Sequence, residues 1–453
     1  MNPNTKIAAA IAAVLGVGAA GVASAAAPTL AQAQSPFTSF YISGSSAAKS
    51  AILGALENDV CGGAGNYLLF SSYNTNTNFF AVSCAPAAST GIANANGTNV
   101  FDLYYRDEGG SVTGALPLVS GSAIAQLNLA GAACTGNSCS VAVGGSSASN
   151  GTSDTFTGTA THQSNLGVTD VEPGALIHDN YPSAYSQSVY GHASPAQLGA
   201  LTTFAVFQQV FGIFVNKTGL HTPICLGSDA VKSILNSEYT DWSKVEDCAT
   251  HAAVAAASVP ITLVNREAGS GSRTATSIYW LNDLCDPTFV GVEEDQTTDY
   301  FSTGNVLGAA NTTSGGVTYA SIDNNFGAQA TTTPNMVLAS IDGVFPSNLA
   351  AAQGQYEWWV ESTLVQPNYS QTTQQSSIAS FLETDLANGN TAPHSQQVML
   401  IPDSGTNTTP AIPASTTANT CSNSACSVST STAIYVNPFT RQKVTCNIPT
   451  SFL

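Results

Sequence analysis

The sequence predicts an α/β fold built around parallel sheets, because short apolar segments alternate with segments of helical periodicity. Phe37–Ile42 predicts a buried strand, a small polar turn begins at Gly44, and the stretch from Ala48 to Leu56 carries apolar residues on one helical face. Val259–Val264 is a β-branched strand that opens onto a Gly/Ser loop, and Arg273–Leu284 follows as a helix. Strand, polar turn and helix form the repeating unit of such sheets.

The remaining segments follow the same pattern, with two exceptions. Residues 115–165 are rich in Gly, Ser, Thr and Asn and predict an insertion of loops and small hairpins. Residues 403–432 are rich in Thr, Ser, Asn and Pro and predict a linker. The other expected elements are strands at Phe101–Tyr105 and within Phe204–Val215, and helices at Asp229–Leu235 and Ser376–Leu386.

The composition describes an acidic chain that can bury a core. Of 453 residues, 43% are hydrophobic and 8% charged, and the net charge is −18. This charge disfavours nucleic acids and anionic membranes as partners. It does not exclude a small anion, because local backbone dipoles decide that contact.

Residues 1–25 predict an export signal that is cleaved. Lys6 precedes an apolar run from Ile7 to Val22, and Ala23-Ser24-Ala25 offers a cleavage site, with a second possible site after Ala33. A membrane anchor is the alternative, but the run is shorter than the roughly 20 residues that span a bilayer. We therefore expect a periplasmic or extracellular protein without membrane insertion.

The ten cysteines of an exported chain predict disulfides. Metal binding is the weaker alternative, because the closely spaced pairs lack a nearby His or a further Cys. Neither a metal nor a cofactor is predicted. The candidate pairs are Cys61/Cys84, Cys134/Cys139, Cys225/Cys285 and Cys421/Cys426.

Three of the four arginines, Arg106, Arg266 and Arg273, lie within seven residues of a Gly/Ser loop. Arginine binds oxyanions bidentately, and loops at helix starts present free N–H groups to the same ligand. The strongest motif runs from Arg266 to Arg273, where Ser270, Gly271 and Ser272 would direct N–H groups and hydroxyls at an anion. The alternative is a glycine-rich turn with a surface arginine.

Three further segments add to this pattern. Gly44-Ser45-Ser46-Ala47 has the same chemistry at another helix start, although a simple N-cap is the commoner explanation. Gly109-Gly110-Ser111 is a weaker signal. Asp170 follows a short apolar segment, and an ionised carboxylate there would accept the O–H of phosphate and reject sulfate, which has no proton. The alternative for Asp170 is a residue in an ordinary turn.

In this order, the four segments resemble the phosphate-binding proteins of bacterial phosphate importers and the related DING proteins. The resemblance spans about Phe37 to Leu386, without residues 115–165. Ser272 stands where the family usually has Thr. The resemblance implies that phosphate is bound by Ser45, Ser46, Ala47, Ser111, Asp170, Arg266, Ser270, Gly271 and Ser272.

The same resemblance implies the type II periplasmic-binding-protein fold, with two α/β lobes joined by two crossing strands. The first lobe would comprise 36–205 and 313–453, the latter with a Ser/Thr-rich extension, and the second lobe 206–312. Phosphate captured between the lobes would pass unchanged to a membrane ABC importer. A disulfide between Cys225 and Cys285 is also implied.

Two other functions are alternatives to the capture of phosphate. A phosphatase would need Ser270 or Ser46 as nucleophile with a base or metal ions, but the six histidines are scattered. The sequence therefore predicts that the protein is not an enzyme. A cell-surface structural or adhesive protein that retains a binding-protein fold is the stronger alternative, because the Ser/Thr/Asn-rich insertion and the many cysteines suit an exposed location.

Overall fold

The computed structural model describes residues 26–74, 76–145, 156–281, 299–325 and 332–388, and short stretches beyond them. Those stretches are 398–400, 421–422, 425–426, 435–436, 439–441, 444–446 and 450–451. The predicted export signal at 1–25 and Cys285 lie outside the described residues. Among the described residues, no helix combines the length and apolar character needed to cross a membrane.

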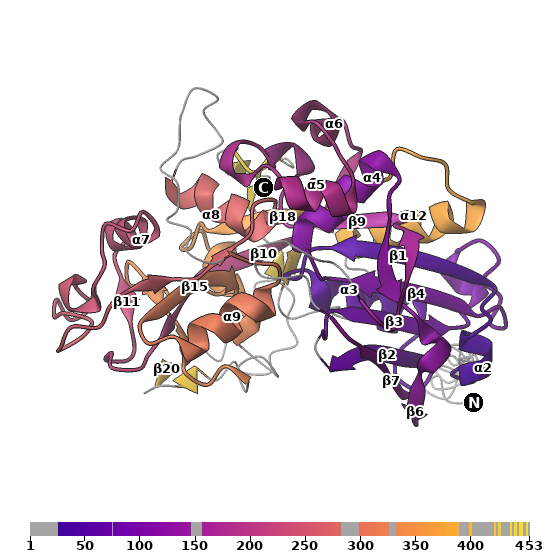
Figure 1. The fold of residues 1–453 in the computed structure, drawn as a ribbon, viewed down its shortest axis with the longest axis horizontal. Coiled ribbons are helices and arrows are strands. Elements are labelled where there is room, and N and C mark those ends of the chain that lie inside the picture. The colour runs from indigo at the N-terminus through magenta and orange to yellow at the C-terminus, as the bar shows by residue number, and fades with distance from the viewer. Residues whose placement is uncertain are drawn as a thin grey trace, which may run out of the picture.

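The fold is mixed α/β, and one large sheet runs through the molecule (Figure 1). In spatial order its main strands are β12 (Thr262–Leu263), β15 (Gly316–Ser321), β10 (Thr203–Asn216), β18 (Trp359–Val365), β9 (Leu166–Thr169), β1 (Thr38–Gly44), β4 (Phe101–Arg106), β3 (Phe79–Cys84), β2 (Tyr67–Asn74), β7 (Ser138–Val143) and β6 (Ala133–Thr135).

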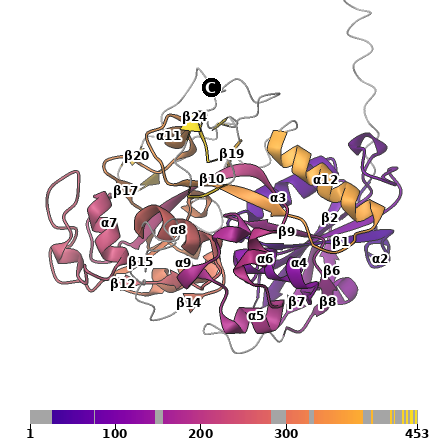
Figure 2. The ribbon, with the colours of Figure 1, turned by 90° about the horizontal axis from the view of Figure 1, so that it is seen from above.

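The predicted strand–turn–helix unit is present at the start of this sheet. Strand β1 pairs in parallel with both β4 and β9. Helix α3 (Lys49–Ala55) follows β1, and its apolar residue Ile52 packs with Phe40 and Ile42 of that strand. Helix α12 (Thr373–Asn388) covers the same core beside α3 (Figure 2). Other pairs, such as β3 with β4 and β10 with β18, are antiparallel, so the sheet is mixed and not purely parallel.

Strands β10 and β18 connect two groups of strands, as expected for two lobes joined by crossing strands. Residues Thr203–Val210 of β10 pair with β18, which in turn pairs with β9. Residues Phe211–Val215 of β10 pair with β15. We call the part of the molecule that contains β1 to β9 the first lobe, and the part that contains β11 (Cys225–Leu226) to β17 (Ser340–Ile341) the second lobe.

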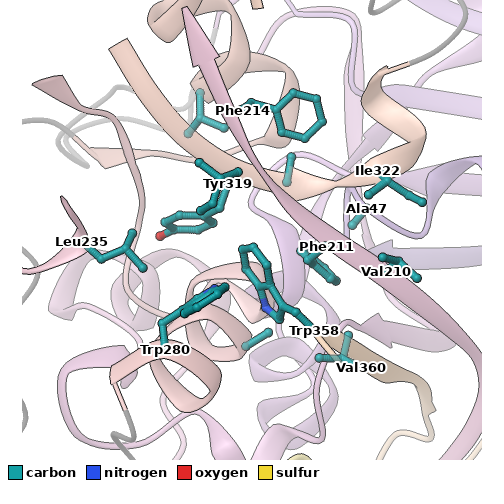
Figure 3. Close-up of a cluster of buried hydrophobic side chains, with 14 of the residues drawn as sticks. Ala47, Val210, Phe211, Phe214, Leu235, Trp280, Tyr319, Ile322, Trp358 and Val360 are labelled. Atoms are coloured by element: carbon teal, nitrogen blue, oxygen red, sulfur yellow. The ribbon is translucent and has the colours of Figure 1, made fainter. Parts of the chain in front are cut away.

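The second lobe continues past the boundary expected at residue 312. Strand β15 pairs with β10 and β12, β16 (Met336–Leu338) pairs with β10, and β17 pairs with β11. A buried aromatic cluster supports the region where β10 meets these strands (Figure 3). In it, the Trp358 ring lies 6.1 Å from that of Phe211 and 5.4 Å from that of Trp280.

The insertion forms hairpins, as predicted. Strands β6 and β7 form an antiparallel hairpin that the Cys134–Cys139 disulfide closes. Strands β5 (Ala123–Leu127) and β8 (Thr159–Gln163) form a separate antiparallel pair.

The disulfides of the two lobes differ in how well the sequence predicted them. Cys61–Cys84 is present as expected. The Cys225–Cys285 pairing is wrong, because Cys225 is bonded to Cys248, whose Cα lies 5.1 Å away and whose N–H also donates to the Cys225 carbonyl. Cys248 had no assigned partner in the sequence.

Some of the described C-terminal stretches pack onto the crossing strands, on either side of residues 403–432, of which the structure describes only 421–422 and 425–426. Strand β19 (Val398–Leu400) pairs with β10, and β22 (Tyr435–Val436) pairs with β19. The Arg441 guanidinium lies 4.8 Å from the Trp359 ring centre, and the Arg441 N–H donates to Glu361. The extension therefore contributes to the core beside β10 and β18.

Candidate functional site

Asp170 lies where two parallel strands end side by side. It directly follows β9, while Ser45 directly follows β1, and these strands are paired with Gly44 opposite Val168. The N–H of Ser45 donates to the carbonyl of Val168 at 2.8 Å. The carboxyl ends of adjacent parallel strands are the usual position of a ligand in α/β proteins.

Asp170 contacts residues of the other three predicted segments, so all four meet here. One carboxylate oxygen accepts from the Ser45 hydroxyl, and the other accepts from the Ser272 hydroxyl at 2.9 Å. The N–H of Asp170 donates to the Ser111 hydroxyl at 3.1 Å. Asp170, Ser45, Ser111 and Ser272 are all buried, so the contact is an internal polar cluster and not a surface turn.

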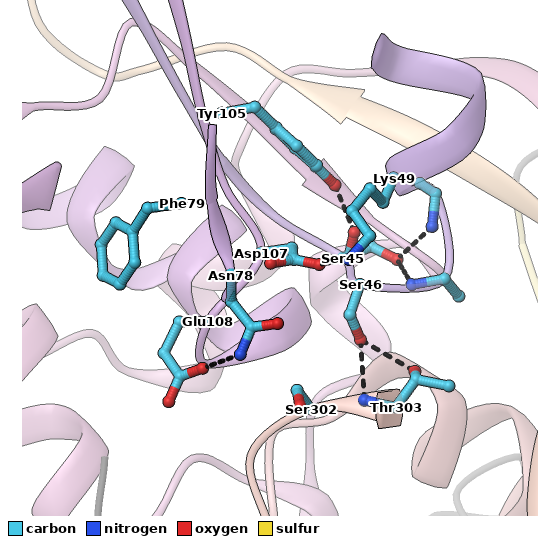
Figure 4. Close-up of polar contacts among 12 residues, drawn as sticks. Ser45, Ser46, Lys49, Asn78, Phe79, Tyr105, Asp107, Glu108, Ser302 and Thr303 are labelled. Carbon is cyan, nitrogen blue, oxygen red and sulfur yellow. Dashed lines mark hydrogen bonds and ion pairs between the residues drawn. The ribbon is translucent and has the colours of Figure 1, made fainter. Parts of the chain in front are cut away.

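Ser45 also holds the turn that precedes α3, although the N-cap residue of that helix is Ala48. Its hydroxyl oxygen accepts from the N–H groups of Ala47 at 3.1 Å and Ala48 at 3.0 Å (Figure 4). The Tyr105 hydroxyl donates to the Ser45 carbonyl. The Ala47 N–H therefore has an acceptor within the turn, and the Ala47 side chain packs into the hydrophobic core.

The second lobe reaches Asp170 through the N-terminus of helix α8 (Gly271–Leu281). A β-carbon at Gly271 would lie 2.5 Å from the Ser111 hydroxyl and 2.8 Å from the Asp170 β-carbon, so only glycine permits this approach. Ser270 is buried, and its N–H donates to the Glu267 carbonyl at 3.1 Å. The first N–H groups of a helix have no acceptor inside it, so those of Gly271 and Ser272 suit an anion.

Arg266, at the start of the segment that contains Ser272, is a buried cation held in a fixed orientation. It ends strand β13 (Asn265–Arg266), and its Nε and Nη2 donate to the carbonyls of Tyr300 at 3.2 Å and Phe301 at 3.0 Å. Its Nη1 donates to the Thr303 hydroxyl at 3.2 Å. It lies against Gly110 of the first lobe, where a β-carbon would be 2.6 Å from Nη2 and φ is +60°.

Ser46 joins this arrangement through Thr303 and not through Asp170. The two hydroxyl oxygens are 2.8 Å apart, and the Thr303 N–H donates to the Ser46 hydroxyl at 3.2 Å (Figure 4). Thr303 begins helix α9 (Thr303–Thr312), which Ser302 caps. The sequence reasoning missed Thr303, because a Thr after an N-cap Ser is an ordinary helix start.

Burial and neighbouring charges act in opposite directions on the central pair. Burial raises the pKa of Asp170, while the hydroxyls of Ser45 and Ser272 and the charge of Arg266 lower it. Burial likewise lowers the pKa of Arg266, whereas Glu267 and Asp170 raise it. The carboxylate and the guanidinium thus stabilise each other's charged forms.

An ion pair lies near this cluster, and the sequence did not predict it. Lys49 Nζ is 3.0 Å from Asp107, a buried residue whose charge also acts on Arg266. Burial raises the pKa of Asp107 to about 6, against the lowering effect of Lys49. Burial also raises the pKa of Asp323 to about 6, and the charge of Lys49 again opposes this.

The other two arginines near Gly/Ser loops serve packing. Arg106 lies 5.3 Å from the ring centres of Phe79 and Phe156 and 5.4 Å from that of Tyr190. Arg273 donates to the carbonyl of Arg266 at 3.3 Å, so it supports the neighbouring arginine. Only Arg266 of the three belongs to the Asp170 cluster.

The cluster has the chemistry of an oxyanion site with one proton acceptor. Hydroxyls, helix N–H groups and a guanidinium supply donors, and Asp170 supplies the acceptor. In the part of the chain that the structure describes, no three His, Cys, Asp or Glu side chains are grouped as ligands for a metal ion.

Searches with family models and among curated proteins gave no match. Among solved structures, the chain is similar to a protein from Clostridium perfringens described as a phosphate ABC transporter substrate-binding protein with bound phosphate, at 13% identity and a TM-score of 0.40, covering 77% of this chain and 96% of that one. A second is an ABC-type phosphate transport receptor from Vibrio cholerae, at 16% identity and a TM-score of 0.30, covering 50% of this chain and 76% of that one. A third is a DING protein, at 14% identity and a TM-score of 0.32, covering 49% of this chain and 71% of that one.

These are the two kinds of protein that the four sequence segments resemble. At such low identities and TM-scores the similarity carries no argument about function. The function proposed below therefore depends on the residues of the site.

Proposed function

We propose that the protein binds inorganic phosphate at the Asp170 cluster and releases it unchanged. The observation that supports this most directly is a buried carboxylate bonded to the Ser45 hydroxyl from the first lobe and the Ser272 hydroxyl from the second, with the Arg266 charge acting on it. A buried carboxylate among anion donors is unfavourable for an anion without a proton. It is favourable for an anion that carries an O–H.

In this proposal each predicted residue has a role. Arg266 supplies the countercharge, and Asp170 accepts the phosphate O–H, replacing a serine hydroxyl that then turns to a phosphate oxygen. The donors from the first lobe are Ser45, Ser46 and Ser111, together with the Ala47 N–H once it leaves the Ser45 hydroxyl. Those from the second lobe are Ser270, Gly271 and Ser272. Sulfate would leave Asp170 without a proton to accept and would be rejected.

Binding without turnover fits the surroundings of the two candidate nucleophiles. Ser46 contacts Thr303, and the Ser270 hydroxyl accepts from the Arg273 N–H at 3.4 Å, so neither contact supplies a general base. Among the described residues, no carboxylate or histidine cluster is available for metal-assisted hydrolysis.

The setting of this activity is also part of the proposal. Three described disulfides suit an oxidising compartment, which supports export to the periplasm or the cell exterior. There the protein would deliver phosphate to a membrane ABC importer.

Calorimetric titration of dialysed protein, produced under phosphate starvation, tests the proposal directly. We expect saturable one-to-one binding of phosphate at neutral pH and no heat with sulfate. Asp170→Asn should weaken phosphate binding, whereas Asp229→Asn, an exposed residue on helix α7 (Ser228–Leu235), should not. Absence of heat with phosphate, together with no phosphate released on unfolding, would overturn the proposal.

A further inference from the structure

We propose that Thr303 is a positioning residue that latches the two lobes around the bound anion and controls how fast the anion leaves. This inference rests on the proposed function. Thr303 is not expected to touch the phosphate. Its role follows from its contacts with Arg266 in its own lobe and with Ser46 in the other lobe, 257 positions away in the sequence.

Chemistry fixes the directions of the bonds from Arg266 and from the Thr303 N–H, and these favour Thr303 as the donor to Ser46. A guanidinium only donates, so the Thr303 hydroxyl oxygen must accept from Arg266 Nη1, at 3.2 Å. The hydroxyl hydrogen of Thr303 can then point to the Ser46 oxygen, 2.8 Å away. The Thr303 N–H donates to the same oxygen at 3.2 Å. Ser46 thus accepts two hydrogen bonds, which leaves its own hydrogen for an anion oxygen.

This chain links the countercharge in one lobe to a donor in the other. Because consecutive hydrogen bonds polarise one another at a buried site, Arg266 strengthens Ser46 as a donor through Thr303. Thr303 is buried. The carbonyls of Tyr300 and Phe301, which precede Thr303 in the same loop, also hold Arg266 in place. The loop that orients the arginine therefore also carries the latch.

The latch affects release more than capture. The Ser46–Thr303 contact joins the lobes and forms when they come together, so its loss should raise the dissociation rate constant and leave the association rate constant nearly unchanged. Loss of one such hydrogen bond corresponds to about a tenfold faster release.

Stopped-flow phosphate kinetics with four single variants and one double variant test the inference. Thr303→Val removes the hydroxyl and keeps the shape, and it should raise the dissociation rate constant about tenfold. Thr303→Ser restores the hydroxyl and should release phosphate as the wild type does. Thr312→Val makes the same change at the exposed far end of α9 and should have no effect. In combination with Ser46→Ala, Thr303→Val should add little to the effect of Ser46→Ala alone.

The failure of this inference is distinguishable from that of the proposed function. If the wild type binds phosphate but Thr303→Val releases it at the wild-type rate, the latch is wrong and the phosphate site stands. Additive effects of Ser46→Ala and Thr303→Val would contradict the latch in the same way. A wild-type protein that does not bind phosphate overturns the proposed function and the latch together.

Discussion

The surroundings of Arg106 and Arg266 differ although the two arginines occupy similar positions in the sequence. Each ends a strand and precedes a Gly/Ser loop, and each is buried. Aromatic rings surround Arg106, and its Nη1 donates to the Ala125 carbonyl at 3.1 Å. Arg266 donates to backbone carbonyls and to the Thr303 hydroxyl, and it lies against Gly110. Its charge acts on Asp170. Gly110 leaves room beside the Arg266 guanidinium, whereas three aromatic rings pack against that of Arg106.

Replacing each arginine by alanine should separate these roles with the largest effects. Arg266→Ala should weaken phosphate binding at least about 100-fold, because the countercharge is lost. Arg106→Ala should lower the free energy of unfolding by about 3 kcal/mol, because it leaves a cavity among three aromatic rings and a buried carbonyl without its donor. Calorimetry measures the first effect and urea unfolding the second. Normal phosphate affinity in Arg266→Ala would show that the comparison is wrong.

Asp102 and Asp170 form a second contrasting pair of buried carboxyl groups. Burial raises the pKa of Asp102 to about 7, while hydrogen bonds from Ser83 and Tyr104 lower it. The folded protein therefore holds a proton that the unfolded chain releases near pH 4, so stability should fall as the pH rises from about 4 to 7, by about 4 kcal/mol. Asp102→Asn, which stays neutral, should lack this loss. Urea unfolding of both proteins at pH 5 and pH 8 measures this loss of stability. An equal change in the free energy of unfolding in the two proteins would contradict the prediction.

The Cys134–Cys139 hairpin lies at the far edge of the first lobe and should matter only for stability. Because its loop is short, replacing both cysteines by serine should cost about 2 kcal/mol. Phosphate affinity of the folded variant should be unchanged. Thermal unfolding and calorimetry on the same sample check both statements, and weakened binding would extend the site beyond the Asp170 cluster.

The smallest expected effect concerns the pH dependence of binding. Asp170 must be ionised to accept the phosphate O–H, and burial raises its pKa. Affinity should therefore fall as the pH drops through this raised pKa, by about tenfold for each pH unit below it. Asp107 and Asp323 titrate nearby with the opposite effect, since their protonation removes negative charge. The difference between wild type and Asp170→Asn isolates the Asp170 contribution, and parallel pH profiles would contradict it.

Local patterns in the sequence predicted the elements and the four site segments, because each depends on neighbouring residues. The β1–α3 unit follows from an apolar run, a serine turn and a helical face. The meeting of the four segments at Asp170 was implied by their resemblance to a known family. Within residues 115–165, β6 with β7 and β5 with β8 form the predicted antiparallel pairs, whereas helix α4 (Leu116–Ser120) was not predicted.

The parts that the sequence did not predict depend on contacts between distant segments. Thr303 acquires its role only because Ser46 and Arg266 lie on either side of it. The pairing of Cys225 with Cys248 depends on how β11 meets the following loop. Arg441 follows a stretch with the composition of a linker, yet it stacks on Trp359. No local pattern distinguishes such residues from ordinary turns and linkers.

The distribution of tryptophan gives the protein a built-in optical probe. All four, Trp242, Trp280, Trp358 and Trp359, lie in the second lobe or at the start of β18, and the first lobe has none. Trp280 and Trp358 stack edge to face beside β10, where the lobes are joined. Emission from the intact protein therefore reports on the junction and the second lobe, so a spectral change on adding phosphate can follow their rearrangement without any label.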